Sequence, residues 1–157
     1  SYSYIYKLPC TALRFFTVYG PYGRPDMALF KFTSNILNNK NIDLFNDGKH
    51  RRDFTYIDDI VNGIVSIIKK PNKEPIPYKI FNIGNGNSRK LTDYLSSIEK
   101  KLNKKAKIKN LPLQLGDVQN THSDISSLKK YAKYDPKTDI EEGIDNFITW
   151  YKDYYKK

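Results

Sequence analysis

The sequence predicts an α/β fold, because strand patterns alternate with helix patterns along its 157 residues. Residues 11–19 are rich in aromatic and β-branched side chains and are followed by Gly20-Pro21, which is typical of a buried strand. Apolar side chains recur at helical spacing over residues 57–68, and Pro71 ends this element. A second long strand is predicted at residues 78–83. Two long strands are too few for a doubly wound sheet, so we expect the chain to form part of a larger fold.

Shorter patterns predict the remaining elements. Asp26 is a suitable N-cap for a helix that runs to about residue 38, and residues 42–45 form a short strand before an Asn-Asp-Gly turn. Thr92 is predicted to cap a helix with a core stripe of leucine and isoleucine, and residues 107–109 form another short strand. Residues 138–141 (Thr-Asp-Ile-Glu) have the pattern of a capping box, which predicts a final helix.

The formal net charge of +10 raises the question of a nucleic-acid partner. The lysines occur as scattered pairs, mostly late in predicted helices, where they complement the helix dipole and stay solvated. We therefore expect no nucleic-acid partner. The alternative, a basic nucleic-acid-binding domain, requires steeply salt-dependent binding. An anionic small molecule fits the same charge.

Cysteine content and hydropathy bear on the compartment. The single cysteine, Cys10, excludes an internal disulfide and suits a reducing cytosol. No apolar run approaches the roughly 20 residues that a membrane-spanning helix needs, so no membrane partner is expected. Residues 1–7 lack the pattern of a signal peptide. These observations predict a cytoplasmic protein.

Two familiar kinds of site are not supported by residue spacing. Gly84-Asn85-Gly86 follows a predicted strand, but Arg89 stands where a dinucleotide fingerprint needs its third glycine, which favours a tight strand-to-helix turn. Cys10, His50 and His122 show no paired metal-ligand spacing, so no metal is expected. Both histidines are predicted to be solvent-exposed or hydrogen-bonded.

Two segments carry arginines that are suited to an anion. Arg51 and Arg52 stand just ahead of a predicted helix, and planar guanidinium forks can clamp a phosphate. Pairing with nearby aspartates, or simple solvation, is the alternative and stays open. Arg24 lies in a loop between Gly23 and Pro25, which limit backbone freedom and favour a positioned side chain.

Three blocks together resemble the C-terminal part of nucleotide-sugar epimerases of the extended short-chain dehydrogenase/reductase superfamily, especially UDP-glucuronate 4-epimerases. The first block is Arg-Phe-Phe-Thr-Val-Tyr-Gly-Pro at 14–21 with Gly-Arg-Pro-Asp-Met-Ala at 23–28. The others are Arg-Asp-Phe-Thr-Tyr-Ile-Asp-Asp-Ile at 52–60 and Gly-Asp-Val at 116–118. The resemblance implies the last Rossmann strands and helices plus a small α/β substrate-binding domain. Residues 1–157 are then a single C-terminal region, without the N-terminal NAD-binding Rossmann portion.

The resemblance also implies roles for residues of the first two blocks. Phe16 would lie against the nicotinamide end of NAD. Thr17 and Arg24 would face the carboxylate of the sugar, which a guanidinium can bind at two points. Arg52 matches the arginine that grips the diphosphate of the UDP-sugar substrate.

Other residues are implied to lie near the nucleotide. Asp43, Leu44 and Phe45 match the strand edge against which uracil packs. Gln114 and Asp117 fall in the segment near the nucleotide, although many relatives have arginine at the Gln114 position.

The family reaction, as the resemblance implies it, interconverts UDP-glucuronate and UDP-galacturonate by oxidation and reduction at C4 with tightly bound NAD. A Tyr-x-x-x-Lys pair transfers the proton, and a Gly-rich loop holds the cofactor. Only thirteen residues precede Arg14, and none of the 13 tyrosines has a lysine four places later. No catalytic residue is therefore assigned, and we expect a fragment that is inactive alone.

Further expectations follow from the position of the fragment within the family. Residues 1–6 would be the tail of the helix that carries the missing catalytic pair. That helix usually contributes to a dimer interface, so the parent is expected to be a homodimer whose interface is disrupted here. Two alternatives stay open: a stand-alone nucleotide-sugar-binding module without catalysis, and a fragment of a UDP-sugar decarboxylase or dehydratase.

Overall fold

Strands and helices alternate along the chain in the computed structural model, which describes residues 1–156. The strands are β1 (Cys10–Phe15), β2 (Thr17–Tyr19), β3 (Asn41–Phe45), β4 (Arg51–Tyr56), β5 (Tyr78–Ile83), β6 (Ser88–Lys90) and β7 (Lys107–Leu111). The helices are α1 (Tyr2–Tyr6), α2 (Ala28–Leu37), α3 (Ile57–Ile68), α4 (Leu91–Leu102), α5 (Ser126–Ala132) and α6 (Ile140–Tyr155), with a short 3-10 helix, η1 (Asn46–Gly48). None of the helices within this range is long and apolar enough to cross a membrane.

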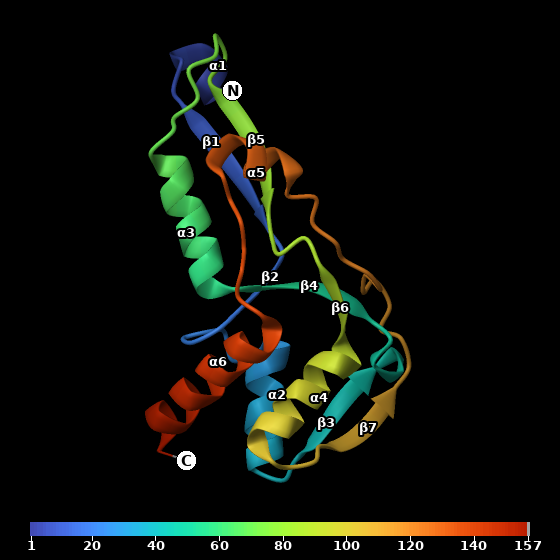
Figure 1. Cartoon of the computed structure of the whole chain (residues 1–157). Helices are drawn as coiled ribbons and strands as arrows, with labels where there is room; N and C mark the ends of the chain where they lie inside the picture. The colour runs from blue at the N-terminus through green and yellow to red at the C-terminus, as the bar shows by residue number, and fades with distance from the viewer. Residues whose placement is uncertain (157) are drawn as a thin grey trace.

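The upper body in Figure 1 is built on a parallel pair, β1 and β5, flanked by α3 and α5. The register runs from Cys10 opposite Tyr78 to Phe15 opposite Ile83. Apolar side chains of α3, β5 and α5 and the segment after α5 form its core; they are Ile60, Ile67, Phe81, Ile83, Leu128, Ala132 and Tyr134. The predicted elements at 57–68 and 78–83 are confirmed with these bounds.

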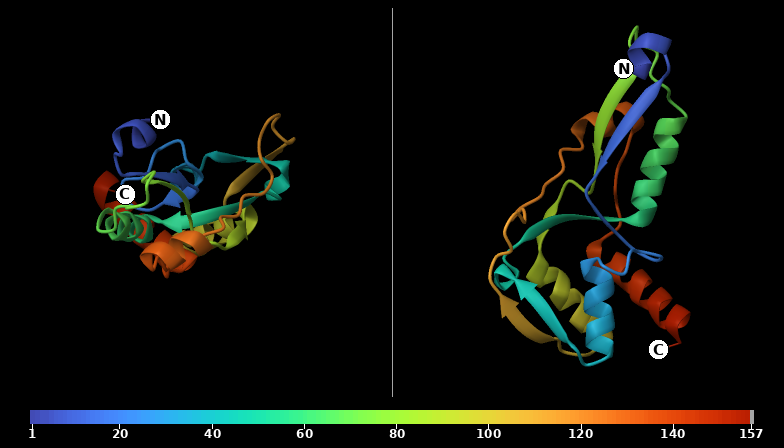
Figure 2. Two further views of the ribbon diagram at one scale, coloured as in Figure 1. Left: turned by 90° about the horizontal axis from the view of Figure 1, so that it is seen from above. Right: turned by 180° about the vertical axis from the view of Figure 1, so that it is seen from behind.

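The lower body packs α2, α4 and α6 beside a second parallel pair, β3 and β7. Its core is larger and aromatic, and Phe54 stacks on Tyr94 with ring centroids 4.0 Å apart. The two chain ends lie at opposite ends of the molecule, Ser1 beside the upper body and the end of α6 beside the lower one (Figure 2). The short strand predicted at 107–109 is confirmed and extends to Leu111.

A third sheet, in the order β2-β4-β6, joins the two bodies. Its presence corrects the prediction of one strand over residues 11–19, because the chain leaves the β1–β5 pair at Phe16 and then pairs with β4. The Phe16 amide still donates to the carbonyl of Ile83 (3.3 Å), whereas Thr17 is already opposite Phe54. Phe16 and Thr17 therefore lie at the junction between two sheets.

β4 was not predicted, because its first three residues, Arg51 to Asp53, are charged and read as a loop before the helix. Pairing with β2 on one side and β6 on the other makes them a strand. The glycine turn at 84–86 accordingly leads into β6, and only then into α4. Tertiary partners decide the conformation of these polar segments.

The positions at which the helices begin were predicted closely, but the predicted capping hydrogen bonds are not formed. α2 begins at Ala28 with Met27 as its N-cap, since the Asp26 carboxylate pairs with Arg24 instead. Thr92 lies inside α4, which begins at Leu91. Asp139 is the N-cap of α6, but its side chain makes no capping hydrogen bond. The predicted capping box is therefore wrong as a set of bonds, although the helix begins where it was expected.

A close approach between α3 and its neighbours makes Gly63 a sensitive position. A Cβ there would lie 2.8 Å from the ring of Tyr134 and 2.9 Å from Cδ1 of Ile83. We expect Gly63→Ala to lower the free energy of unfolding by about 1–3 kcal/mol, despite the better helix propensity of alanine. Urea unfolding measures this, with Asn62→Ala on the exposed side of the same helix as the control. A Gly63→Ala variant as stable as the wild type would contradict the close packing.

Candidate ligand-binding site

A cavity of about 410 Å³ lies where the central sheet meets the lower body. β2, the start of α2, β3, β4 and the loop before residue 120 all contribute to its wall. The lining residues are Thr17, Asp26, Met27, Ala28, Lys31, Phe32, Asp43, Phe45, His50, Arg52, Phe54, Leu91 and Asp117. A concave site with apolar walls and a few converging polar groups is typical of small-molecule binding.

Five of the residues predicted to bind substrate or nucleotide converge on this cavity. They are Thr17, Asp43, Phe45, Arg52 and Asp117. The segments that carry them are far apart in sequence. Parallel pairing of β2 with β4 brings Thr17 to this site, and the parallel bridge between Arg51 and Asn120 brings the segment of Asp117 alongside β4. The structure thus joins the three sequence blocks at one place.

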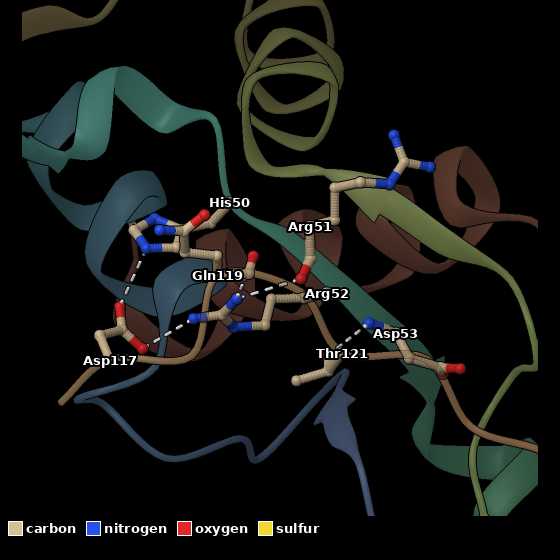
Figure 3. A network of polar contacts seen from close by, with 7 residues as sticks. All are labelled: His50, Arg51, Arg52, Asp53, Asp117, Gln119 and Thr121. Atoms are coloured by element: carbon tan, nitrogen blue, oxygen red, sulfur yellow. Dashed lines mark hydrogen bonds and ion pairs between the residues drawn. The ribbon is translucent and has the colours of Figure 1, made fainter. Parts of the chain in front are cut away.

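The Arg52 guanidinium is anchored on the cavity wall by a network of polar contacts (Figure 3). Its Nη2 donates to Oδ1 of Asp117 at 2.8 Å, and its Nη1 donates to the carbonyls of Arg51 and Gln119 at 3.0 Å each. The side chain is 19% exposed, so these bonds hold it partly out of water. Its carboxylate partner is therefore Asp117, not one of the neighbouring aspartates that the sequence offered.

Residues 119–121 lie along β4 and hold Asp117 in place. The Arg51 amide donates to the carbonyl of Gln119 (2.9 Å), and the Thr121 amide donates to the carbonyl of Arg51 (3.0 Å). The Arg51 side chain points away from Asp117 and donates to the carbonyl of Ser88 (2.6 Å). Because side chains alternate along a strand, Arg51 and Arg52 serve opposite faces.

Asp53, the next residue on β4, is a fully buried carboxylate. It accepts hydrogen bonds from the amides of Asn85 (2.7 Å) and Gly86 (3.0 Å), and from the amide (3.0 Å) and hydroxyl (2.6 Å) of Ser123. The carboxylate thereby ties the 84–86 turn and the 121–123 segment to β4. Its lone pairs are used by the protein, which gives Asp53 a structural role.

His50 was expected to be solvent-exposed or hydrogen-bonded, and the structure corrects this. The residue is 2% exposed, and its Nε2 has no hydrogen-bond partner. That nitrogen lies 3.3 Å from Oδ2 of Asp117, on the cavity wall. One sequence feature indicates that His50 shares the cavity face with Arg52. It stands two residues before Arg52, and alternate residues of an extended chain share a face.

Arg24 does not line the cavity of about 410 Å³. Its side chain is 76% exposed, and its Nε donates to Oδ1 of Asp26 at 3.0 Å. The hydrogen bond from Arg24 holds the pKa of the Asp26 carboxyl below its usual value. Arg24 instead lines a small adjoining cavity of about 20 Å³, which shares Thr17 with the larger one.

Three other predicted residues also lie away from the cavity lining. Leu44 is buried in the lower core, because the alternation along β3 turns Asp43 and Phe45 toward the cavity and Leu44 away from it. Gln114 is exposed, and its carbonyl accepts from the Asp117 amide (3.1 Å) in a turn. Phe16 is half-buried at the junction of β1 and β2.

Two buried tyrosines lie close to the site but stay uncharged. Burial raises the pKa of both Tyr19 and Tyr94, so both phenols keep their protons at neutral pH. Neither is suited to act as a base. Within residues 1–156 no three His, Cys, Asp or Glu side chains are grouped to hold a metal ion.

The sequence of this chain is similar to those of known proteins. A family model described as "NAD dependent epimerase/dehydratase family" matches residues 1–84. Protein CapI of Staphylococcus aureus is 47% identical over 100% of this chain and 51% of its own length. UDP-glucuronate 4-epimerase 2 of Arabidopsis thaliana is 43% identical over 100% of this chain and 39% of its own length.

A solved structure supports the same relationship. UDP-glucuronic acid 4-epimerase from Bacillus cereus, in complex with UDP-glucuronic acid and NAD, superposes with a TM-score of 0.90 and 34% identity. The match covers 98% of this chain and 48% of that chain. The α/β fold class predicted from the sequence is thus confirmed. The chain spans between 39% and 51% of the length of these two curated relatives.

Proposed function

Because the chain belongs to the NAD dependent epimerase/dehydratase family, we propose that it forms the substrate-binding region of a UDP-sugar 4-epimerase that acts on UDP-glucuronate. The convergence of Thr17, Asp43, Phe45, Arg52 and Asp117 on one cavity carries this proposal. Among them, the guanidinium of Arg52 is suited to a diphosphate. The β3 edge at Asp43 and the ring of Phe45 are suited to a nucleotide base. The family relationship and the geometry thus favour the same ligand class.

Each part of a UDP-sugar has a suitable partner on the cavity wall. Arg52 is held with its fork partly desolvated, where a charge-assisted bond to a phosphate oxygen is strong. Asp43 and Phe45 offer a polar and an aromatic contact to the uracil, and Leu44 supports this edge from the core side. Thr17 offers its hydroxyl to the sugar.

Arg24 is proposed to bind the carboxylate of the sugar. Its fork is engaged by the Asp26 carboxylate in this structure, beside the Thr17 end of the cavity. A glucuronate carboxylate has the same shape and charge as the Asp26 side chain. The sugar can therefore replace Asp26 on the guanidinium when the Arg24 side chain turns toward Thr17.

NAD, when bound, supplies the acceptor and donor of hydride. The half-buried ring of Phe16, just after β1, is suited to pack against the nicotinamide. The glycine-rich phosphate loop and the Tyr-x-x-x-Lys pair do not occur among these 157 residues. In this proposal the chain binds and orients the sugar nucleotide, and the remaining chemistry belongs to residues of the family's other half. The expectation that the parent protein is a homodimer stays a prediction.

The carboxylate assignment is tested in the intact enzyme with Arg24→Ala. We expect kcat/KM for UDP-glucuronate to fall about tenfold, because a two-point charged contact is lost. The Kd of UDP is expected to change less than about twofold, because UDP has no sugar carboxylate to contact. Steady-state kinetics and calorimetry measure the two quantities.

Asp26→Asn is the matched control, since it removes the competing carboxylate and keeps the side-chain shape. It is expected to leave UDP-glucuronate turnover unchanged or improved. Equal losses of turnover and UDP binding in Arg24→Ala would contradict the carboxylate assignment. An intact wild type that binds UDP-sugars without epimerising any of them would favour the alternative of a non-catalytic binding module.

A further inference from the structure

The Asp117 carboxylate is shared between two basic side chains. Its Oδ1 accepts from Arg52 at 2.8 Å, and its Oδ2 lies 3.3 Å from Nε2 of His50 (Figure 3). We propose that His50 is a positioning residue of the nucleotide site, which takes over Asp117 when protonated and so releases Arg52 to the diphosphate. This inference rests on the proposed function, in which Arg52 binds a diphosphate.

The burial of His50 supports such a role. An imidazole that is 2% exposed, with its Nε2 unpartnered, is costly unless the nitrogen gains a partner in some state of the protein. The contact with Asp117 is close enough for a charged pair but lacks hydrogen-bond geometry. A small rotation of Asp117 toward His50 would complete that bond and weaken the bond to Arg52.

The balance of charges around the cavity favours a proton on His50 when a diphosphate binds. Two cations, Lys31 and Arg52, line the cavity against three carboxylates, which are those of Asp26, Asp43 and Asp117. A diphosphate brings two further negative charges to this balance. Asp26 is already neutralised by Arg24, so Asp117 is the carboxylate that an incoming phosphate at Arg52 meets first. A proton on His50 offsets that repulsion.

The charged side chains next to His50 in the sequence are engaged elsewhere. The Lys49 ammonium pairs with Asp47 on the exposed side of η1 (3.2 Å). The Arg51 side chain donates to Ser88 on β6. From α4, the Leu91 amide donates to the His50 carbonyl (2.9 Å), which fixes the backbone and contributes no charge. Three further charged groups line the cavity with His50: Arg52, which reaches the same Asp117 carboxylate, Lys31 on α2 and Asp43 on β3. Of the carboxylates in the described residues, that of Asp117 forms the ion-pair contact with the imidazole.

The direction of the pH effect follows from this arrangement. Imidazoles ordinarily titrate near pH 6.5. The diphosphate complex favours protonated His50, so binding takes up a proton near neutral pH, and affinity rises as the pH falls from 8 to 5.5. Aspartate carboxyls ordinarily titrate near pH 3.9, below this interval, whereas imidazoles titrate within it.

UDP-glucose is the appropriate probe, because its diphosphate is esterified at both ends and keeps its charge over this pH range. Its sugar also has no carboxylate, so Arg24 does not enter the measurement. Calorimetry of the intact protein, in buffers of different ionisation enthalpy, gives both the Kd and the protons taken up. We expect binding to be up to about tenfold tighter at pH 5.5 than at pH 8, with proton uptake near pH 7.

His50→Gln is expected to bind UDP-glucose with the same Kd at pH 5.5 and at pH 8, and without proton uptake. His122→Gln, which changes the other, exposed histidine, should retain both effects. Asp117→Asn serves as a second variant, and it should also lose the pH dependence, because the group that His50 pairs with is gone.

The outcomes separate this inference from the proposed function. UDP-glucose binding with no proton uptake, or with equal pH dependence in wild type and His50→Gln, would overturn the role of His50 alone. Failure of the wild type to bind UDP-glucose at any pH would overturn the proposed function and this inference with it.

Discussion

Replacing Arg52 by alanine is expected to weaken the binding of UDP-glucuronate by about 100-fold or more. Charge-assisted hydrogen bonds contribute roughly 1.5–3 kcal/mol each, and a guanidinium can give a diphosphate two of them. The loss is increased by the groups left behind. Asp117 and the Gln119 carbonyl both lose the donor that now holds them, so the phosphate would meet an uncompensated carboxylate.

Calorimetry with UDP-glucuronate and the intact protein measures this loss directly. Arg51→Ala is a close control, because it removes an equal charge from the adjacent residue on the opposite face of β4. It should weaken binding less than about threefold. Arg52→Lys should recover only part of the affinity, since lysine keeps the charge but not the fork. Similar losses in the two alanine variants would indicate that net charge, rather than the geometry of Arg52, attracts the ligand.

Replacing Asp53 by alanine is expected to give the largest loss of stability, about 3–5 kcal/mol in the free energy of unfolding. The change leaves the amides of Asn85 and Ser123 and the Ser123 hydroxyl without their acceptor at a fully buried site, and the Gly86 amide keeps only the Ser123 hydroxyl oxygen. An orphaned buried donor costs about 1–3 kcal/mol, and several are created at once. Water can offset part of this cost by entering the space left by the side chain.

Denaturant unfolding of Asp53→Ala measures the cost, and the exposed Asp58→Ala is the control. Asp58 lies in the first turn of α3, where its removal should cost less than about 1 kcal/mol. Asp53→Asn keeps the shape but turns an amide group toward other donors, so it should also be strongly destabilised. A variant at Asp53 as stable as the Asp58 control would contradict the structural role of the carboxylate.

The elements predicted best are those whose signals are local. α3 and β5 were predicted with their observed bounds. Helical spacing and a following proline mark the first, and aromatic and β-branched residues before a glycine turn mark the second. The capping bonds of Asp26 and Thr92 were predicted wrongly, because several groups compete for each side chain. The Asp26 carboxylate accepts a hydrogen bond from the Arg24 guanidinium, which is a stronger partner than a backbone amide.

β4 shows where local patterns stop being informative. Arg51, Arg52 and Asp53 have the polarity of a loop, but they form a strand because β2, β6 and residues 119–121 supply its hydrogen-bond partners. None of these partners is adjacent in sequence. The pairing also sorts the three side chains, so that Arg52 reaches the cavity while Arg51 and Asp53 do not line it.

The sequence by itself determined the α/β class, the family to which three short blocks belong, and the suitability of its arginines for an anion. These properties depend on residue type and on spacing along the chain. Only the tertiary structure decided that Asp117 is the partner of Arg52 and that His50 is buried beside it. The tertiary structure also decided that Arg24 lies outside the cavity, where it pairs with Asp26. The reason is physical: sheet register and burial depend on segments tens of residues apart, whose pairing no local pattern encodes.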